Sequence, residues 1–192
     1  TATTGWVAIL GEITTNAYVD LQEIVRNTVR DIGYNSSAMG FDWETCGVIS
    51  SIKEQSGDIA QGVNKSYEAR MAGGEVEDQY DLVGAGDQGM MIGFACTETE
   101  EYMPLTVVLS HRLVKRLAEL RKSGALPYLR PDGKSQVTIE YAYGVPKRIE
   151  AVVISTQHDP DVDEATLRAA IEQQVIRDVC PADLDRKSTR LN

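Results

Sequence analysis

The chain has 192 residues, enough for one large domain or two small ones. With 42% hydrophobic and 25% charged residues, its composition is that of a globular protein and not of a disordered one. The formal net charge of −10 argues against non-specific nucleic-acid binding, because few cations remain to neutralise phosphates. No apolar run approaches the roughly 20 residues of a membrane span, and no signal peptide is recognisable, so we expect no membrane partner.

The first fifty residues predict a strand, a helix and a second strand. The apolar run "GWVAILGEITT" predicts a strand through about Ile13. A helix should follow, with Asp20 as its cap and Gly33 at its end. Its apolar residues recur at helical spacing: Leu21, Ile24, Val25, Val29 and Ile32. Residues 45–52, "TCGVISSI", predict the next strand.

A long stretch without clear periodicity runs from Lys53 to Leu82. Such a segment in a globular chain is usually functional or disordered. Residues 64–82 are typical of a solvated, variable insertion. Residues 55–63, "QSGDIAQGV", are small and mostly uncharged, and Gly57 and Gly62 are placed like hinges. Taken alone, that segment is either functional or a plain surface loop.

The second half predicts strands and helices in alternation. "GMMIGFACT" predicts a strand, and Pro104 can take the first position of a helix that stops at Gly124. Six apolar residues should line one face of that helix: Leu105, Val108, Leu109, Leu113, Leu117 and Leu120.

Two further strands and a last helix should follow. We expect a turn at Pro131–Asp132–Gly133, a strand over residues 135–143, a turn at "VPKR" and a strand over residues 149–158. Asp163 can cap the last helix. Its inward positions would be Leu167, Ala170, Ile171 and Val175.

The predicted order mixes hairpin-like neighbours with strand–helix–strand units. This order favours an α+β fold over regular β-α-β alternation. The strand–helix theme recurs on both sides of the long loop. We therefore expect two related subdomains of mixed or antiparallel sheet, each covered by helices.

Residues 84–89, "GAGDQG", match the dinucleotide-binding spacing G-x-G-x-x-G. That motif needs a strand before the glycines and a helix after them, so that pyrophosphate meets the helix N-terminus. Here a polar, acidic stretch precedes the glycines and a strand-like run follows. Asp87 would also repel a phosphate. We therefore reject an NAD site and expect the glycines to form a tight turn.

Cysteine usage and the two ends of the chain carry weaker signals. Cys46, Cys96 and Cys180 are an odd number without C-x-x-C spacing, which favours buried thiols and a reducing, cytoplasmic setting. The chain begins at Thr1 without methionine, so we expect residues to precede it. Residues 185–192, "DRKSTRLN", are interpreted either as a translated sequencing adapter or as a basic, disordered tail.

The glycine segment is part of a series of blocks with a specific resemblance. "GAGDQGMMIGFACTETEEYMPL", "GEITT", "GFDWETCGV", "EQSGDIAQGV", "LPYLRPDGKSQVT" and "VVISTQHD" resemble blocks of the S-adenosylmethionine synthetase (methionine adenosyltransferase) family. The resemblance covers about residues 5–184. The variable length of the insertion at 64–82 is similar to that of bacterial members.

The resemblance implies a transferase of S-adenosylmethionine biosynthesis. The methionine sulfur would attack C5′ of ATP, and the released tripolyphosphate would be hydrolysed to phosphate and pyrophosphate. Mg²⁺ and K⁺, which the family uses, would offset the charge of the leaving group. A sulfur nucleophile needs no general base, so we expect His111 and His158 to be structural.

The resemblance also implies a methionine site and a gate. Glu12 matches the carboxylate that holds the ammonium group of methionine, although by itself it is an ordinary exposed glutamate at a strand end. Gln55 matches the methionine-binding glutamine that begins a flexible gating loop. That loop comprises Gln55, Ser56, Gly57, Asp58, Ile59, Ala60, Gln61, Gly62 and Val63.

The ATP-contacting segment would be Asp132, Gly133 and Lys134. The aspartate could accept hydrogen bonds from ribose hydroxyls, the lysine would meet phosphate, and the glycine would let the backbone approach closely. Outside these blocks the same letters would be an ordinary turn. Asp87, like Lys134, is a catalytic candidate by its match to the signature segment.

Several parts of the family pattern do not occur in this sequence. These are an early His-Pro-Asp-Lys motif, an acidic potassium ligand, a third domain and a later glycine-rich phosphate loop. We expect the domains 1–63 and 83–184, separated by the insertion, with metal ligands supplied from elsewhere. The family further implies dimers with shared active sites, assembled into homotetramers.

We therefore expect a partial enzyme that is inactive alone. The alternative is a non-catalytic nucleotide-binding or subunit-interface protein of the same fold.

Overall fold

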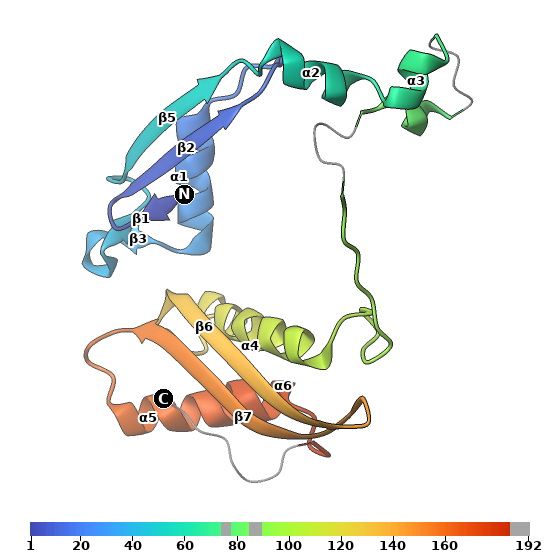
Figure 1. The fold of residues 1–192 in the computed structure, drawn as a ribbon. Coiled ribbons are helices and arrows are strands. Elements are labelled where there is room, and N and C mark those ends of the chain that lie inside the picture. The colour runs from blue at the N-terminus through green and yellow to red at the C-terminus, as the bar shows by residue number, and fades with distance from the viewer. Residues whose placement is uncertain (74–77, 85–89, 185–192) are drawn as a thin grey trace. The chain divides into compact units, whose positions relative to one another are not determined.

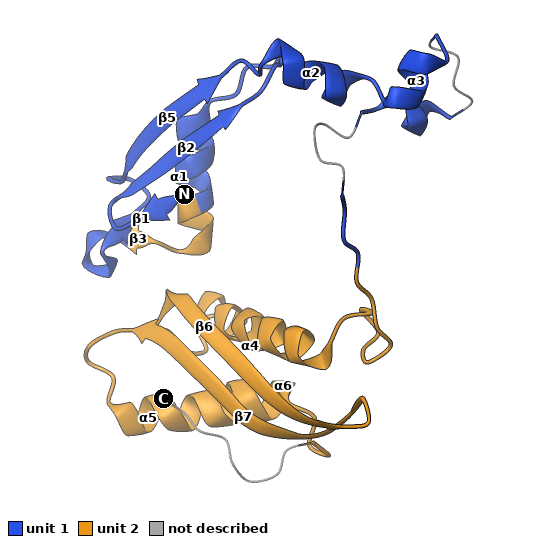
Figure 2. Cartoon of the chain, viewed as in Figure 1, with its two compact units in different colours: residues 1–28, 36–93 blue, residues 29–35, 94–192 orange. Residues whose placement is uncertain are grey.

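The structure, a computed structural model, describes residues 1–73, 78–84 and 90–184 (Figure 1). It divides into two compact units (Figure 2). Unit 1 comprises residues 1–28 and 36–93, and unit 2 comprises residues 29–35 and 94–192.

A three-stranded mixed sheet forms the centre of unit 1. Its order is β1 (Ala2–Thr3), β2 (Trp6–Glu12) and β5 (Gly47–Lys53). β1 is antiparallel to β2, whereas β2 and β5 run parallel, from Trp6 opposite Gly47 to Glu12 opposite Lys53. The two strands predicted from the first fifty residues are confirmed. Because β2 and β5 run parallel and in register, their carboxyl ends meet at one edge of the sheet.

The helix α1 (Leu21–Ile32) has the predicted bounds. The carboxylate of Asp20 accepts a hydrogen bond from Glu23 N at 3.0 Å, and Gly33 ends the helix with φ +111°. Val25 and Val29 are buried, whereas Ile24 and Ile32 remain exposed. The predicted apolar face is therefore only partly covered.

Arg26 anchors α1 to the segment before β5. Its guanidinium donates to Trp43 O at 2.7 Å and to Cys46 O at 3.1 Å. This segment also holds β3 (Asn35–Ser36), the short helix η1 (Ser37–Met39) and β4 (Phe41–Asp42).

The expectation of an irregular segment after Lys53 is wrong. Three short helices occur there: α2 (Gly57–Asn64), α3 (Tyr67–Met71) and η2 (Gln79–Leu82). Two have side-chain caps, since Ser66 Oγ accepts from Ala69 N and Asp78 Oδ1 accepts from Tyr80 N. Helices of one or two turns are shorter than the window over which periodicity is visible, so sequence analysis missed them.

The strand expected in "GMMIGFACT" is not formed by its described residues. Residues 90–96 lie outside any helix or strand, and Met90, Met91, Ile92 and Phe94 are exposed. Apolar composition predicts burial, but a strand also needs a neighbouring backbone to pair with. Among the described residues no strand pairs with residues 90–96, although Cys96 N donates to Tyr102 O at 3.0 Å.

Unit 2 is a long hairpin covered by helices. The strands β6 (Leu129–Ala142) and β7 (Val145–His158) are antiparallel. The hairpin turns at Tyr143 and Gly144, which have φ +52° and +76°. Two positive φ values are typical of the tight turn whose twist matches its strands.

Both turns predicted for this region are therefore wrong. Pro131–Asp132–Gly133 lies within β6, at an irregularity between Leu129 and Gly133, and "VPKR" lies within β7. Proline and glycine mark turns in most sequences, but an irregular strand also accepts them.

Helices α4 (Leu105–Lys122) and α5 (Glu164–Ile171) follow the prediction closely. Pro104 is the residue before α4, and Gly124 ends it with φ +75°. Asp163 Oδ1 caps α5 by accepting from Thr166 N at 2.9 Å. After α5 the chain continues as η3 (Glu172–Ile176), a π-helical turn, and α6 (Arg177–Val179).

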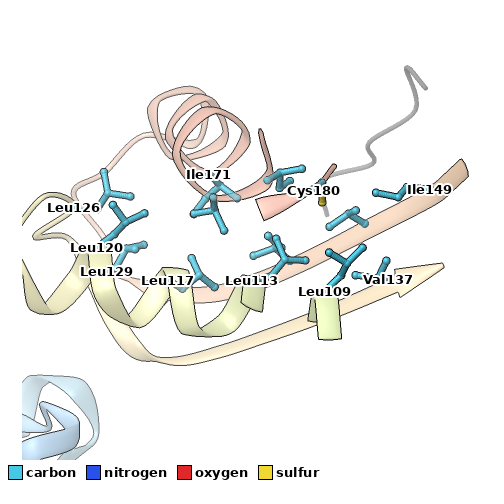
Figure 3. Close-up of a cluster of buried hydrophobic side chains, with 14 residues drawn as sticks. Leu109, Leu113, Leu117, Leu120, Leu126, Leu129, Val137, Ile149, Ile171 and Cys180 are labelled. Atoms are coloured by element: carbon cyan, nitrogen blue, oxygen red, sulfur yellow. The ribbon is translucent and has the colours of Figure 1, made fainter. Parts of the chain in front are cut away.

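The core of unit 2 lies between its helices and the inner face of the hairpin (Figure 3). Leu109, Leu113 and Val175 are completely buried there. Five of the six positions predicted to line α4 and both Ile171 and Val175 of the last helix are buried, and Leu105, Leu167 and Ala170 pack at the margin. The predicted α+β class, with small mixed and antiparallel sheets and helices against them, is confirmed.

Candidate active site

Glu12 and Gln55 lie at the same edge of the sheet in unit 1. Glu12 is the last residue of β2 and stands opposite Lys53, the last residue of β5. Ile13 N donates to Lys53 O at 2.9 Å, which continues the pairing beyond Glu12. Gln55 follows Lys53 by two residues and is half-buried. The parallel register therefore places Gln55 two residues beyond the partner of Glu12, although 43 positions separate Glu12 and Gln55 in sequence.

This edge carries complementary chemistry. The Glu12 carboxylate can pair with an ammonium group, and the Gln55 amide can both donate and accept hydrogen bonds. Lys53 adds an exposed cation, which sequence analysis did not single out. The predicted second strand ended at Ile52, one residue before Lys53, so the sequence prediction did not place Lys53 in a strand. An anion, an amide and a cation at one edge suit a zwitterionic ligand.

The candidate gate, residues 55–63, is mostly helical. It comprises Gln55, Ser56 and nearly all of α2. No residue of α2 is buried, and Asp58 lies in its first turn, where the helix dipole favours an anion. A helix without buried residues gains little from packing. The predicted mobility of this segment stays a prediction.

Asp132, Gly133 and Lys134 form part of β6 in unit 2. Asp132 and Lys134 are exposed, whereas Gly133 is half-buried. A Cβ atom added to Gly133 would lie 3.5 Å from Leu117 Cδ1 of α4. Alternation along the strand explains this difference, because successive side chains point to opposite faces. Lys134 stands opposite Ser155 of β7. An anion and a cation thus share the open face of the hairpin.

Two contacts hold this part of β6 in place. Arg130 Nε donates to Asp159 Oδ1 at 2.9 Å, and the Arg130 side chain is largely buried. Ser135 Oγ donates to Ser110 O of α4 at 2.7 Å. The irregular start of β6 is thereby tied to the chain beyond β7 and to the covering helix, which keeps Asp132 and Lys134 on a supported strand.

Among the cavities of the described residues, one is lined in part by Gly62 of the gate and one by Gly133, but none by Glu12, Asp132 or Lys134. A cavity of about 480 Å³ lies over the insertion, with Lys65, Tyr67 and Tyr80 among its lining residues. A smaller one of about 80 Å³ lies between α4 and β6, beside Gly133. Neither is lined by Glu12, Asp132 or Lys134. Glu12 in unit 1, and Asp132 and Lys134 in unit 2, are exposed on open surfaces. Residue chemistry and strand register, and not a cavity, therefore mark the candidate site.

The remaining candidates are placed as follows. Asp87 lies outside the described residues. His111 is exposed, and His158 Nδ1 lies 2.8 Å from Asp159 O. Cys46 and Cys180 are buried and Cys96 is partly buried, and none of the three forms a disulfide.

In the part of the chain that the structure describes, no group of three or more His, Cys, Asp or Glu residues could hold a metal ion. Within the same residues, no helix is long and apolar enough to cross a membrane.

Comparison with known protein families matches two parts of the chain to domains of one family. Residues 1–57 match the model of the S-adenosylmethionine synthetase N-terminal domain, and residues 82–192 match that of the S-adenosylmethionine synthetase central domain. The chain belongs to the S-adenosylmethionine synthetase family. The resemblance stated from the sequence blocks is confirmed.

A curated relative supports the same assignment. The chain is 53% identical over 189 residues, 98% of its length, to the S-adenosylmethionine synthase of Roseiflexus castenholzii (strain DSM 13941 / HLO8). It spans 47% of that relative's length. Residues 58–81 fall between the two matched domains. The expected boundaries at 63, 82 and 184 stay predictions, and residues 185–192 lie outside the described residues.

Proposed function

We propose that this chain supplies the N-terminal and central parts of an S-adenosylmethionine synthetase. The whole protein would form S-adenosyl-L-methionine from ATP and L-methionine. The observation that supports the proposal is the register that sets Glu12 opposite Lys53, two residues before Gln55, in a chain that is 53% identical to a named synthase. That name also disfavours the non-catalytic alternative of the same fold.

The edge of β2 and β5 would bind methionine. Glu12 would pair with the ammonium group, and Gln55 would hydrogen-bond the zwitterion from the start of the gate. Lys53, opposite Glu12, would face the methionine carboxylate. The three groups together satisfy both charges of the amino acid.

The open face of β6 would bind ATP. Asp132 would accept hydrogen bonds from ribose hydroxyls, and Lys134 would meet the triphosphate as a point charge. Gly133 would act through its backbone, because it has no side chain and its Cβ position is directed at Leu117 of α4. Asp87 would act close to the reacting groups, as the signature segment implies.

The reaction would be a displacement at C5′. A lone pair of the thioether sulfur forms the new S–C bond, the C5′–O bond breaks, and its electrons leave with tripolyphosphate. The sulfur carries no proton, so no general base is needed. Binding would align sulfur and carbon, and Lys134 would stabilise charge that develops on the leaving oxygens. Mg²⁺ and K⁺ would further offset the triphosphate charge in the whole protein.

The gate and the oligomer would complete the site. Residues 55–63 would close over the substrates and exclude water. A dimer with shared active sites, assembled into a homotetramer, is supported by apolar side chains left exposed on β2 and β5, such as Leu10 at 66% and Ile49 at 56%. Three cysteines without a disulfide support a reducing, cytoplasmic setting, and the charge of −10 supports the absence of a nucleic-acid partner.

A chimera tests the proposal. Residues 1–184 would replace the aligned part of the Roseiflexus castenholzii relative, which supplies the remainder of a synthase. We expect S-adenosylmethionine to form from ATP and methionine. Glu12→Gln should raise the KM for methionine, whereas Glu44→Gln, an exposed glutamate before β5, should not. A folded chimera without product, or equal effects of both substitutions, would contradict the proposal.

A further inference from the structure

Two segments of unit 2 that are distant in sequence meet next to Asp132. Residues 29–35, which include the end of α1, belong to this unit. A Cβ added to Gly33 would overlap Arg121 Nη1, in the last turn of α4, and would lie 3.8 Å from Pro131 Cγ. Gly33 therefore packs both on the Arg121 guanidinium and on the residue that precedes Asp132 in β6.

Arg121 takes part in this contact by packing and not by pairing. Its side chain is half-buried, and burial lowers its pKa. Among the described residues no carboxylate forms an ion pair with Arg121. With Pro131 and Gly133 it lines the cavity of about 80 Å³ between α4 and β6. A planar guanidinium can stabilise neighbouring backbone in this way without a counter-ion.

Tyr34, the next residue after Gly33, responds to the same groups. Its pKa is raised first by burial and then by the negative charge of Asp132, whereas the positive charge of Arg121 acts in the opposite direction. Screening in water limits such effects to about 10 Å or less. Tyr34 therefore lies near both Asp132 and Arg121, in agreement with the contacts of Gly33.

The backbone that carries Asp132 receives little support from its own sheet. Leu129 pairs with His158 and Gly133 pairs with Thr156, and the register is irregular between these two pairs. Asp132 falls inside that irregularity, and Pro131 has no N–H to donate to a neighbouring strand. Contacts from outside the hairpin therefore determine where this part of β6 lies.

We propose that Gly33 and Arg121 are positioning residues for Asp132. They pack against Pro131 and hold the irregular part of β6, so that the Asp132 carboxylate stands where it can accept hydrogen bonds from the ribose of ATP. Neither residue contacts the nucleotide itself. The inference rests on the proposed role of Asp132 in ATP binding and extends it to two segments to which that role assigned no residue.

Kinetics of the chimera test the proposal. Arg121→Ala should raise the KM for ATP by about tenfold, because a small displacement of an orienting group has a large effect, and should leave the KM for methionine unchanged. Lys122→Ala, at the exposed neighbouring position, is the matched control and should change neither. Gly33→Ala should act like Arg121→Ala, since its methyl group displaces the guanidinium. Gly124→Ala controls for backbone strain, because Gly124 also has a positive φ but nothing within 4 Å of its Cβ position.

A double variant separates displacement of Arg121 from other effects at Gly33. Once Arg121→Ala has removed the guanidinium, Gly33→Ala should raise the KM for ATP no further, because the two changes disturb one contact. Three results would overturn the proposal. These are multiplicative effects in the double variant, equal increases in the KM values for ATP and methionine, and a Gly33→Ala variant that behaves like Gly124→Ala.

A titration without substrate keeps this inference separate from the proposed function. In the 192-residue chain, NMR of ring-labelled tyrosine follows the pKa of Tyr34, and Tyr34→Phe identifies its signal. Asp132→Asn should lower that pKa, because the negative charge that raises it is removed. A pKa of Tyr34 that does not respond to Asp132→Asn would overturn the arrangement, whatever the chimera does. A chimera without product would contradict the proposed function, while the titration would still report on the arrangement.

Discussion

Tyr141 Oη donates a hydrogen bond of 2.7 Å to Glu98 Oε2, and the same oxygen accepts from Leu105 N at 3.0 Å. Glu98 thereby joins the end of β6 to the first residue of α4. The pKa of Tyr141 is raised to about 12, first by burial and then by the hydrogen bond to Glu98. The pKa of Glu98 is lowered, first by Leu105 N–H and then by Tyr141.

The pair should make unit 2 sensitive to pH at both extremes. The contribution of Tyr141 is fully present below its ordinary pKa of 10.0 and is lost as pH rises toward about 12. The contribution of Glu98 is present above 4.5 and is lost as pH falls through its lowered pKa. Tyrosinate absorbance, compared with Tyr141→Phe, measures the titration. We expect Glu98→Gln to lower the pKa of Tyr141, and an unchanged titration would refute the link.

Lys134 should matter for catalysis, and Lys115 should not. In the chimera, Lys134→Met should lower kcat by about a hundredfold, or about 3 kcal/mol, because a charge-assisted contact with the leaving group is lost. Lys115 is exposed on α4, so Lys115→Met should leave kcat nearly unchanged. Steady-state rates of phosphate release provide the measurement. Similar rates for the two variants would refute the assignment of Lys134.

The gate should become ordered when both substrates bind. Without them, residues 55–63 gain little from packing, since α2 has no buried residues. We expect slower hydrogen exchange in this segment when ATP and methionine are added together to the chimera. Residues 21–32, in α1, serve as the internal reference and should not change. Unaltered hydrogen exchange in residues 55–63 would contradict the prediction that this segment closes over the substrates.

Two glycines of unit 2 should respond differently to alanine. A Cβ on Gly133 would meet Leu117, Thr156 and Ser155 at 3.5 Å or more, which is ordinary contact, so Gly133→Ala should leave the free energy of unfolding nearly unchanged. Gly124 has φ +75°, so Gly124→Ala should cost about 1–2 kcal/mol despite the open space around it. Urea denaturation distinguishes the two. Equal losses of unfolding free energy in the two variants would show that the positive φ of Gly124 does not determine the cost of the substitution.

The core of unit 2 should depend on Leu113. It is completely buried between α4 and the hairpin, so Leu113→Ala should lower the free energy of unfolding by about 2–5 kcal/mol. Val145 is 52% exposed, and Val145→Ala should cost much less. Calorimetry of both variants checks the difference. A cost near that of Val145→Ala would mean that Leu113 is not part of the core.

The sequence by itself determined the elements whose signals are local. Asp20, Gly33, Gly124 and Asp163 marked helix ends because caps and positive φ values depend on neighbouring residues only. The apolar stripe of α4 predicted its buried face, since a helix of 18 residues shows its period clearly. The family blocks, each a contiguous string, identified Glu12, Gln55, Asp132 and Lys134 as candidates.

Only the tertiary structure decided which segments pair and which residues meet. The apolar run at Met90–Phe94 forms no strand, because pairing depends on a partner that composition does not reveal. Pro131 and Gly133 lie inside β6, where Gly133 pairs with Thr156 of β7 after an irregularity in the register. Glu12 stands opposite Lys53, and Gly84 packs on Gly62, through contacts between segments far apart in the chain. Such contacts depend on how backbones approach in space, which no short window of sequence contains.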